Sequence, residues 1–335
     1  MEAFVKKDDV TKSEVTMTLL GVKTNMSGNA VDYWAKNITS ICPDSNIAPK
    51  ITLGRTKFSY TLCHGVSPFL HEKQQENLKS VPEYVALFDE SLNSVSQKSQ
   101  MDIHIRFYDP NQNMVVTVFY DSVFLGHTRA VDLLKGFCEK LERIDQLRHL
   151  IAVSMDGPSV NWKFLTELET KRCHQNLPDL LQVGSCALHV VHRSFECGHS
   201  SSAFAVDVIL KAAYNLFKDS PARRSDFITL TDSEDFPQRF CAVRWCENSS
   251  LVKRFLSSFE NLQKYCKEVE PKPKVTSFEK IDNALKDPLT KPKLCFFKFI
   301  ADLVEPFLTR FQSDEPLMPY LYDELMDVME AVGRR

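Results

Sequence analysis

The sequence predicts an α/β protein in which a mixed sheet with flanking helices lies between helical segments. Two observations carry this prediction. The first is a pair of hydrophobic runs, residues 84–89 and 151–156, that each end on an aspartate. Such runs are typical of buried strands that open into a loop. The second is the order of the predicted elements, in which three strands precede a helix and strands then alternate with helices.

Length and composition set the broad class. The chain has 335 residues, of which 43% are hydrophobic and 25% are charged, and these are ordinary globular values. Its net charge of −3 means that any basic surface for nucleic acid must be local. The N-terminus lacks a signal-peptide core, and no apolar run reaches ~18 residues. We therefore expect a nuclear or cytoplasmic protein that is neither secreted nor bound to membranes, with its ten cysteines reduced.

Residues 1–80 predict an N-terminal helical segment. Residues 1 to about 20 are polar, and we expect the start of this stretch to be poorly ordered. Residues 27–38 space their apolar side chains for one face of a helix, and Pro43 begins a turn with a ready N-cap.

Residues 81–248 predict the sheet domain. Alternation is clearest at Ile103, Ile105 and Phe107, and Asp109 begins a hairpin turn. The predicted elements are strands at 83–88, 102–108 and 114–120, a helix at 129–147, a strand at 149–155, a helix at 160–172 and a fifth strand at 181–187. This is the element order of the ribonuclease H-like fold. In that fold the first and fourth strands lie side by side, so Asp89 and Asp156 would meet.

Residues 249–335 predict part of an all-helical region. The chain turns helical already after residue 187, with helices expected at 189–197 and 203–218, and another helix is expected at 249–267. A Lys/Pro-rich stretch at 270–293 is expected to be an exposed linker or loop. A final helical pair at 294–329 should break at Pro306 and Pro316.

The acidic pair is the first candidate site. Two carboxylates delivered from neighbouring strands provide the hard oxygen ligands that Mg²⁺ or Mn²⁺ uses in phosphoryl transfer. Asp89 and Asp156 are therefore candidate metal ligands and catalytic residues. The alternative for each is a purely local role, since aspartate commonly ends a strand or caps the next helix.

Cys186 and His189 have a C-x-x-H spacing that zinc could use. The second pair, Cys197 and His199, is separated by one residue and is a poor complement. We therefore predict structural roles, with Cys186 and His189 buried at the end of the fifth strand, and zinc binding is the alternative.

Four residues are candidates for DNA contact. Arg244 could bind a phosphate and Trp245 could stack on a base, although such a tryptophan is more often a packing anchor. Arg55 and Lys57 could meet a DNA backbone, although short basic clusters are usually solvated.

Taken together, these strings resemble the hAT superfamily of DNA transposases and the zinc-finger-associated host proteins derived from them. The resemblance covers roughly residues 20–315. Its strings, in the family's order, are residues 42–48, 54–57, 88–91, 105–109, 154–157, 186–189, 217–221 and 243–245.

The resemblance implies a ribonuclease H-like core in which an acidic triad and two divalent metal ions cut and join DNA. Asp89 and Asp156 match the first two acids. The third, a glutamate, follows a large helical insertion near a dimerisation segment, and the chain is expected to stop inside that insertion. The late glutamates are unconvincing substitutes, and Pro158 stands where relatives usually carry alanine; the glutamates are Glu305, Glu315, Glu324 and Glu330.

We therefore expect a truncated or domesticated hAT-like protein that binds DNA or protein, or self-associates, without complete transposase chemistry. The alternative is an active transposase subunit that completes its triad from elsewhere. A third alternative is a product with no selected function.

Overall fold

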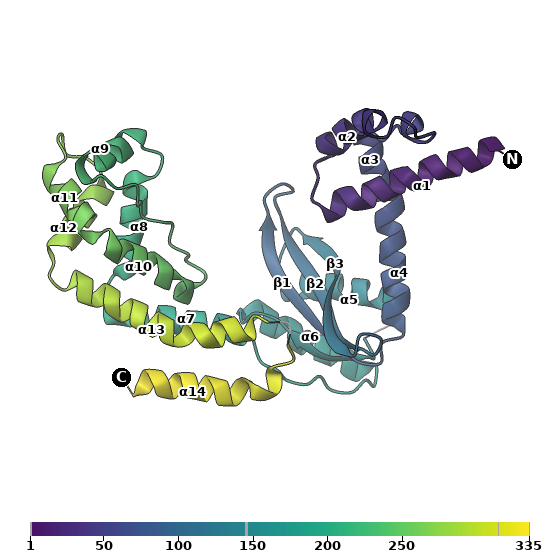
Figure 1. Ribbon diagram of the computed structural model, residues 1–335. Helices are drawn as coiled ribbons and strands as arrows, with labels where there is room; N and C mark the ends of the chain where they lie inside the picture. The colour runs from purple at the N-terminus through teal and green to yellow at the C-terminus, as the bar shows by residue number, and fades with distance from the viewer. Residues whose placement is uncertain (1, 145–146, 314, 335) are drawn as a thin grey trace.

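The computed structural model describes residues 2–144, 147–313 and 315–334 and has a mixed α/β architecture. A four-stranded sheet lies beside an N-terminal helical unit, and a larger helical unit extends from the sheet so that much of it stands across a wide gap from both (Figure 1). Within the described residues, no helix has the length and apolar character needed to cross a bilayer.

The N-terminal unit is helical from its first described residue. It contains α1 (Glu2–Lys23), α2 (Gly28–Ile41), η1 (Ala48–Lys50), α3 (Arg55–Thr61), a π-helical turn η2 (Leu62–Val66) and α4 (Ser67–Lys79). The polar stretch after the start of the chain forms most of α1. Buried Glu14 accepts a hydrogen bond from the Thr52 backbone N–H at 2.8 Å, which ties α1 to the segment before α3.

The sheet contains β1 (Tyr84–Asn93), β2 (Lys98–Asp109), β3 (Met114–Leu125) and β4 (Leu150–Ser154) in the order β3-β2-β1-β4. β2 is antiparallel to both β1 and β3, whereas β1 and β4 are parallel. The predicted adjacency of the first and fourth strands is therefore confirmed.

One face of the sheet is covered by α5 (Ala130–Leu141), the short turn η3 (Glu142–Ile144) and α6 (Ser159–His174). The alternation in β2 explains this packing, because Ile103 and Ile105 are fully buried while the residues between them point to the other face. Phe88, Phe137 and Phe164 meet edge to face at the centre, with ring centroids 5.1–6.1 Å apart.

β1 does not end at Asp89, as the sequence predicted. Its ladder with β2 continues from Asp89, opposite Asp102, to Asn93, opposite Lys98. Asp89 therefore lies within β1 and not at its end.

The predicted fifth strand is absent from the described structure. The segment instead touches β4 at two points, where the Leu181 N–H donates to Ile151 and the Cys186 N–H donates to the Met155 carbonyl, both at 2.8 Å. Between these two points Gly184 adopts a left-handed φ of +73°, which interrupts an extended ladder.

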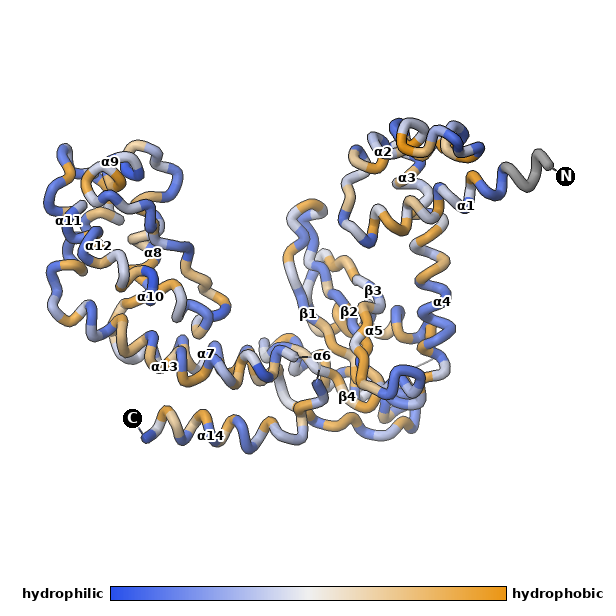
Figure 2. The backbone as a smooth tube through the Cα atoms, in the orientation of Figure 1, coloured by the Kyte–Doolittle hydropathy of each residue, from blue (hydrophilic) through white to orange (hydrophobic). Residues whose placement is uncertain are grey.

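The larger helical unit begins at α7. Its elements are α7 (Ala187–Ser202), α8 (Val206–Phe217), α9 (Pro221–Thr231), η4 (Trp245–Asn248), α10 (Ser249–Ser257), α11 (Phe259–Glu268), α12 (Thr276–Lys286), α13 (Thr290–Phe311), η5 (Met318–Tyr320) and α14 (Leu321–Gly333). Figure 2 shows hydrophobic residues recurring along α13 and α14. A single hydrophobic cluster extends from Val206 to Phe297, so residues 206–248 pack with the region predicted as the insertion.

Two expectations for this unit are wrong. The Lys/Pro-rich stretch is not an exposed linker, because it contains α12, which buries Phe278, Ile281 and Leu285. The last pair of helices does not break at Pro306, since α13 continues through it to Phe311. The chain then returns to the sheet, where Arg106 Nη2 donates to the Glu315 carbonyl at 3.0 Å.

Candidate functional site at the acidic end of β1 and β4

The parallel pairing of β1 and β4 brings the two predicted aspartates to one end of the sheet. The register pairs Leu87 with Ser154, and Asp89 and Asp156 each follow two residues later. Asp89 is exposed, whereas Asp156 is partly buried just after β4 ends. The topology thus delivers both carboxylates from β1 and the adjacent edge strand β4.

Glu90 is a third acid at this corner, and the sequence reading overlooked it. Burial raises the pKa of the Glu90 carboxyl, and the nearby charges of Asp156 and then Asp89 raise it further. The signal was present in the sequence, because Tyr84, Ala86 and Phe88 alternate as buried residues and Glu90 continues that face. The corner therefore disfavours a further negative charge.

Asn161 holds Asp156 from the first turn of α6. Its side-chain Nδ2 donates to Asp156 Oδ1 at 2.5 Å, and the residue is 1% exposed. Its Oδ1 has no hydrogen-bond partner among the described residues. Pro158 stands at the N-cap of α6 with extended backbone, and its carbonyl accepts from the Asn161 N–H. Pro158 thus fits the loop that places Asn161 beside Asp156.

Gly157 allows the segment before α7 to approach this loop. A Cβ at that position would lie 3.3 Å from both side-chain atoms of Ser185. The close approach keeps Asp156 next to the segment that hydrogen-bonds to Met155.

The oxygens at the corner are of the hard type that Mg²⁺ or Mn²⁺ prefers. Asp89, Asp156 and Glu90 could supply carboxylate ligands, and Asn161 could supply an amide oxygen. Across residues 2–144, 147–313 and 315–334, however, no group of three or more His, Cys, Asp or Glu side chains is placed to hold one metal ion.

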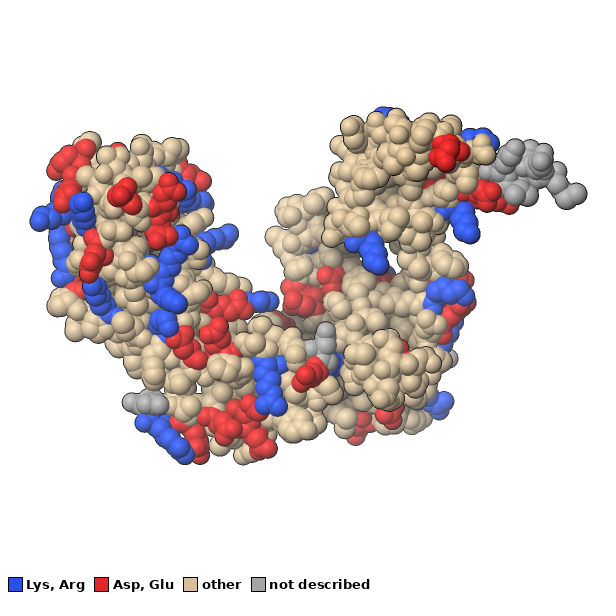
Figure 3. Space-filling view, viewed as in Figure 1, with Lys and Arg blue, Asp and Glu red and all other residues tan. Residues whose placement is uncertain are grey.

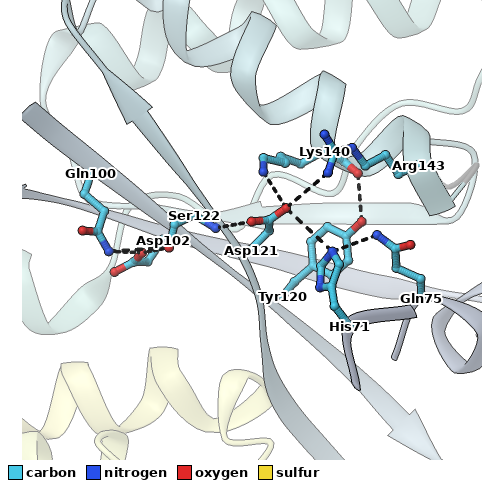
Figure 4. Close-up of polar contacts among 9 residues, drawn as sticks. All are labelled: His71, Gln75, Gln100, Asp102, Tyr120, Asp121, Ser122, Lys140 and Arg143. Carbon is cyan, nitrogen blue, oxygen red and sulfur yellow. Dashed lines mark hydrogen bonds and ion pairs between the residues drawn. The ribbon is translucent and has the colours of Figure 1, made fainter. Parts of the chain in front are cut away.

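A second polar cluster lies around Asp121 on β3 (Figure 4). Asp121 Oδ2 lies 2.6 Å from Lys140 Nζ and 3.9 Å from both Arg143 Nη1 and His71 Nε2. Its carboxylate is mostly buried, and these three partners come from α5, η3 and α4 respectively. Tyr120 O–H donates to the Lys140 carbonyl at 2.9 Å. This cluster fastens the N-terminal unit to the sheet domain.

Figure 4 also shows a second group of polar side chains, formed by Gln100, Asp102 and Ser122. Asp102, opposite Asp89 in the β1–β2 ladder, accepts hydrogen bonds from Ser122 Oγ and Gln100 Nε2. Neutral donors thereby hold the Asp102 carboxylate, and Ser122 links it to the Asp121 cluster, because the Ser122 backbone N–H donates to Asp121 Oδ1 at 2.8 Å.

Cys186 and His189 do not lie as predicted. Cys186 is partly buried at the N-cap of α7, and His189 is exposed one turn later, so the prediction that both are buried is wrong. Both residues lie at the start of α7, and no strand is described at residues 181–187.

The DNA-contact candidates are divided between structural and exposed positions. Trp245 is 6% exposed and packs edge-on against Phe240, so it is unavailable for stacking on a base. Lys57 Nζ lies 2.5 Å from the buried Glu14 carboxylate, whose charge it balances. Arg55 is exposed, and Arg244 is exposed while paired with Glu247 at 3.2 Å.

The distribution of charged side chains on the face shown in Figure 3 also bears on DNA contact. Lys and Arg side chains are interspersed with Asp and Glu over the larger helical unit, and a wide hollow separates it from the rest (Figure 3). A basic surface for DNA on this face would therefore be small.

No protein-family model matches the chain, and no curated protein matches it significantly.

Proposed function

We propose that the chain is a transposon-derived, hAT-like nuclear protein with a ribonuclease H-like core, and that it binds DNA or protein without cutting DNA. The observation that carries the proposal is the strand order β3-β2-β1-β4 with β1 and β4 parallel, which puts Asp89 and Asp156 on adjacent strands. The eight strings that resemble the hAT superfamily give the same two residues as its first two acids.

Two contacts at the corner support loss of the cutting step. Phosphoryl transfer needs metal ions fixed beside the attacking and leaving oxygens. Asp156 Oδ1 is already engaged by the Asn161 amide N–H. Burial and the charges of the two aspartates raise the pKa of the Glu90 carboxyl, so a third negative charge at this corner is disfavoured.

DNA binding, where it occurs, would rest on few cations. Arg55 and Arg244 are the exposed candidates, while Lys57 is committed to Glu14. Lys and Arg contacts to phosphate release counterions, so the affinity should be weak and should fall steeply with salt.

The test is incubation of the purified chain with labelled hairpin and terminal-repeat duplexes in Mg²⁺ or Mn²⁺. We expect no nicking or joining, and we expect DNA binding measured by fluorescence anisotropy to weaken as salt rises. Arg55→Ala and Arg244→Ala should each lower the salt slope by about 1. Arg129→Ala is the matched control, because Arg129 is another exposed arginine paired with an acidic neighbour, Asp132.

The alternative is an active transposase subunit in which Glu90 supplies the third carboxylate. Its proximity to Asp89 and Asp156 is the observation that favours this alternative. Metal-dependent cutting that disappears in Asp89→Ala, Asp156→Ala and Glu90→Gln would establish it and overturn the non-cutting proposal.

A further inference from the structure

α7 connects the sheet domain to the larger helical unit. At its start, the Cys186 N–H donates to the Met155 carbonyl next to β4. Along its length α7 packs against η4 and α13 of the helical unit. The contacts that hold α7 on that unit therefore help to set how the two parts of the molecule are joined.

Two histidines on one face of α7 make these contacts. His192 and His199 are seven residues apart, close to two helical turns. His192 Nδ1 accepts from the Cys246 backbone N–H at 3.3 Å, and His199 Nε2 accepts from the Val206 backbone N–H at 3.2 Å. A backbone N–H can only donate, so each accepting ring nitrogen must be unprotonated.

The surroundings of His199 favour its neutral form. Its ring lies 5.1 Å from the Trp245 ring and 5.6 Å from the Phe297 ring, centroid to centroid. It serves as the acceptor at the start of α8, where Ala205 has no side chain that could cap the helix. The positive end of the α8 dipole disfavours a cation there.

The charged groups nearby do little to reverse this preference. His192 is surrounded by Glu247, Arg244 and His189, and His199 by Asp207 and Lys211. Each acid already has a cationic partner, because Glu247 pairs with Arg244 at 3.2 Å and Asp207 pairs with Lys211 at 2.9 Å. Burial is the largest cause that lowers the pKa of both imidazoles.

We propose that His192 and His199 form an acid-sensitive latch that holds α7 on the rest of the larger helical unit while both rings are neutral. Protonation of either ring turns its acceptor into a donor that faces another N–H, so the hydrogen bond is lost and like dipoles oppose each other. This inference does not depend on the proposed function.

The direction of the pH effect follows from the lowered pKa values. The released state takes up protons at the ordinary histidine pKa of about 6.5, whereas the latched state resists protonation. The latch is fully stabilising above that pH. It weakens as the pH falls below about 6.5 and through the lower values of the folded state.

The test follows hydrogen exchange at the Cys246 and Val206 amides by NMR in the full chain. After correction for the intrinsic pH dependence of exchange, we expect protection at pH 7.5 and a loss of about tenfold or more at pH 5.5. Amides of β2 serve as the internal reference. Unchanged protection of both amides at pH 5.5 would overturn the latch.

A variant separates titration from packing. In His192→Asn/His199→Gln, side-chain carbonyls replace the accepting Nδ1 and Nε2 without titrating, so protection at pH 7.5 should stay and its loss at pH 5.5 should vanish. His189→Gln, on the same helix but exposed, should behave as the wild type. The same acid response in the double variant and the wild type would contradict the proposal.

A second readout uses Trp245 alone. The chain has three tryptophans, and Trp34→Phe/Trp162→Phe leaves only the one beside His199. Its fluorescence should be quenched as the His199 ring gains a proton, with a midpoint below pH 6.5. A midpoint at or above 6.5 would show that the ring is not held neutral, and this measurement needs no change in either histidine.

Discussion

At the scale of single residues, the ionised Glu90 carboxyl lowers the stability of the fold by an amount that can be measured. Its raised pKa means that the ionised form is disfavoured in the fold, so its penalty is present at neutral pH and disappears below about pH 4.5. We predict that Glu90→Gln stabilises the chain at pH 7 by about 0.2–1 kcal/mol, the range for relief of like charges on adjacent strands. Urea unfolding at pH 7 and pH 4 should show the gain at the higher pH alone.

The matched control is Glu83→Gln, since Glu83 is exposed just before β1. This change should leave stability unaltered at both pH values. Destabilisation by Glu90→Gln at pH 7 would mean that the Glu90 carboxylate makes a favourable contact, and it would strengthen the case for a bound cation.

The sequence led to Asp89 and Asp156 but not to their neighbours. The two aspartates end hydrophobic runs and so stand out. Asn161 lies in a helix, and its contact with Asp156 depends on the loop at Pro158. Glu90 reads as an exposed residue of a loop unless β1 is known to continue past Asp89. Both depend on tertiary packing that local patterns do not encode.

At the scale of elements, α12 shows why a composition-based reading failed. Lysine and proline suggested a linker, but Phe278, Ile281 and Leu285 recur at helical spacing and are buried. Four of the strands were predicted in position because of their apolar runs, and so was α6, although β1 and β3 each continue five residues past their predicted ends at 88 and 120. The fifth strand was not, because Gly184 breaks its ladder with β4.

We predict that Ile281→Ala destabilises the larger helical unit by about 2–5 kcal/mol, because Ile281 is fully buried and the surrounding core cannot fill the cavity. Hydrogen exchange in α8 and α11 should rise, since both share that core. Lys280→Ala, at the neighbouring exposed position, should change stability by less than about 0.5 kcal/mol. Equal effects of the two changes would mean that α12 is not packed on the unit.

At the scale of the whole molecule, Asp121 fastens the N-terminal unit. Its carboxylate forms an ion pair with Lys140 and lies near the His71 ring of α4. We predict that Asp121→Asn costs about 1.5–3 kcal/mol, because a charge-assisted hydrogen bond is weakened and Lys140 loses its partner. Limited proteolysis should then cut between α4 and β1 sooner than in the wild type.

The control for this change is Asp132→Asn. Asp132 also pairs with a cation, Arg129 at 2.7 Å, but that arginine is largely exposed and the pair lies within one helix. Such exposed pairs contribute little to stability, so proteolysis between α4 and β1 should be unchanged. Equal sensitivity in both variants would assign the effect of Asp121 to net charge and not to its contacts.

The return of the chain from α13 to the sheet has a mechanical consequence. The larger helical unit is joined to the sheet domain at the start of α7, through Cys186 and Met155, and again through Glu315 and Arg106. A body held at one point can swivel in every direction, whereas a body held at two points can only rock about the line between them. The two parts should therefore move mainly by rotation about the axis through these two attachment points, which widens and narrows the hollow between them.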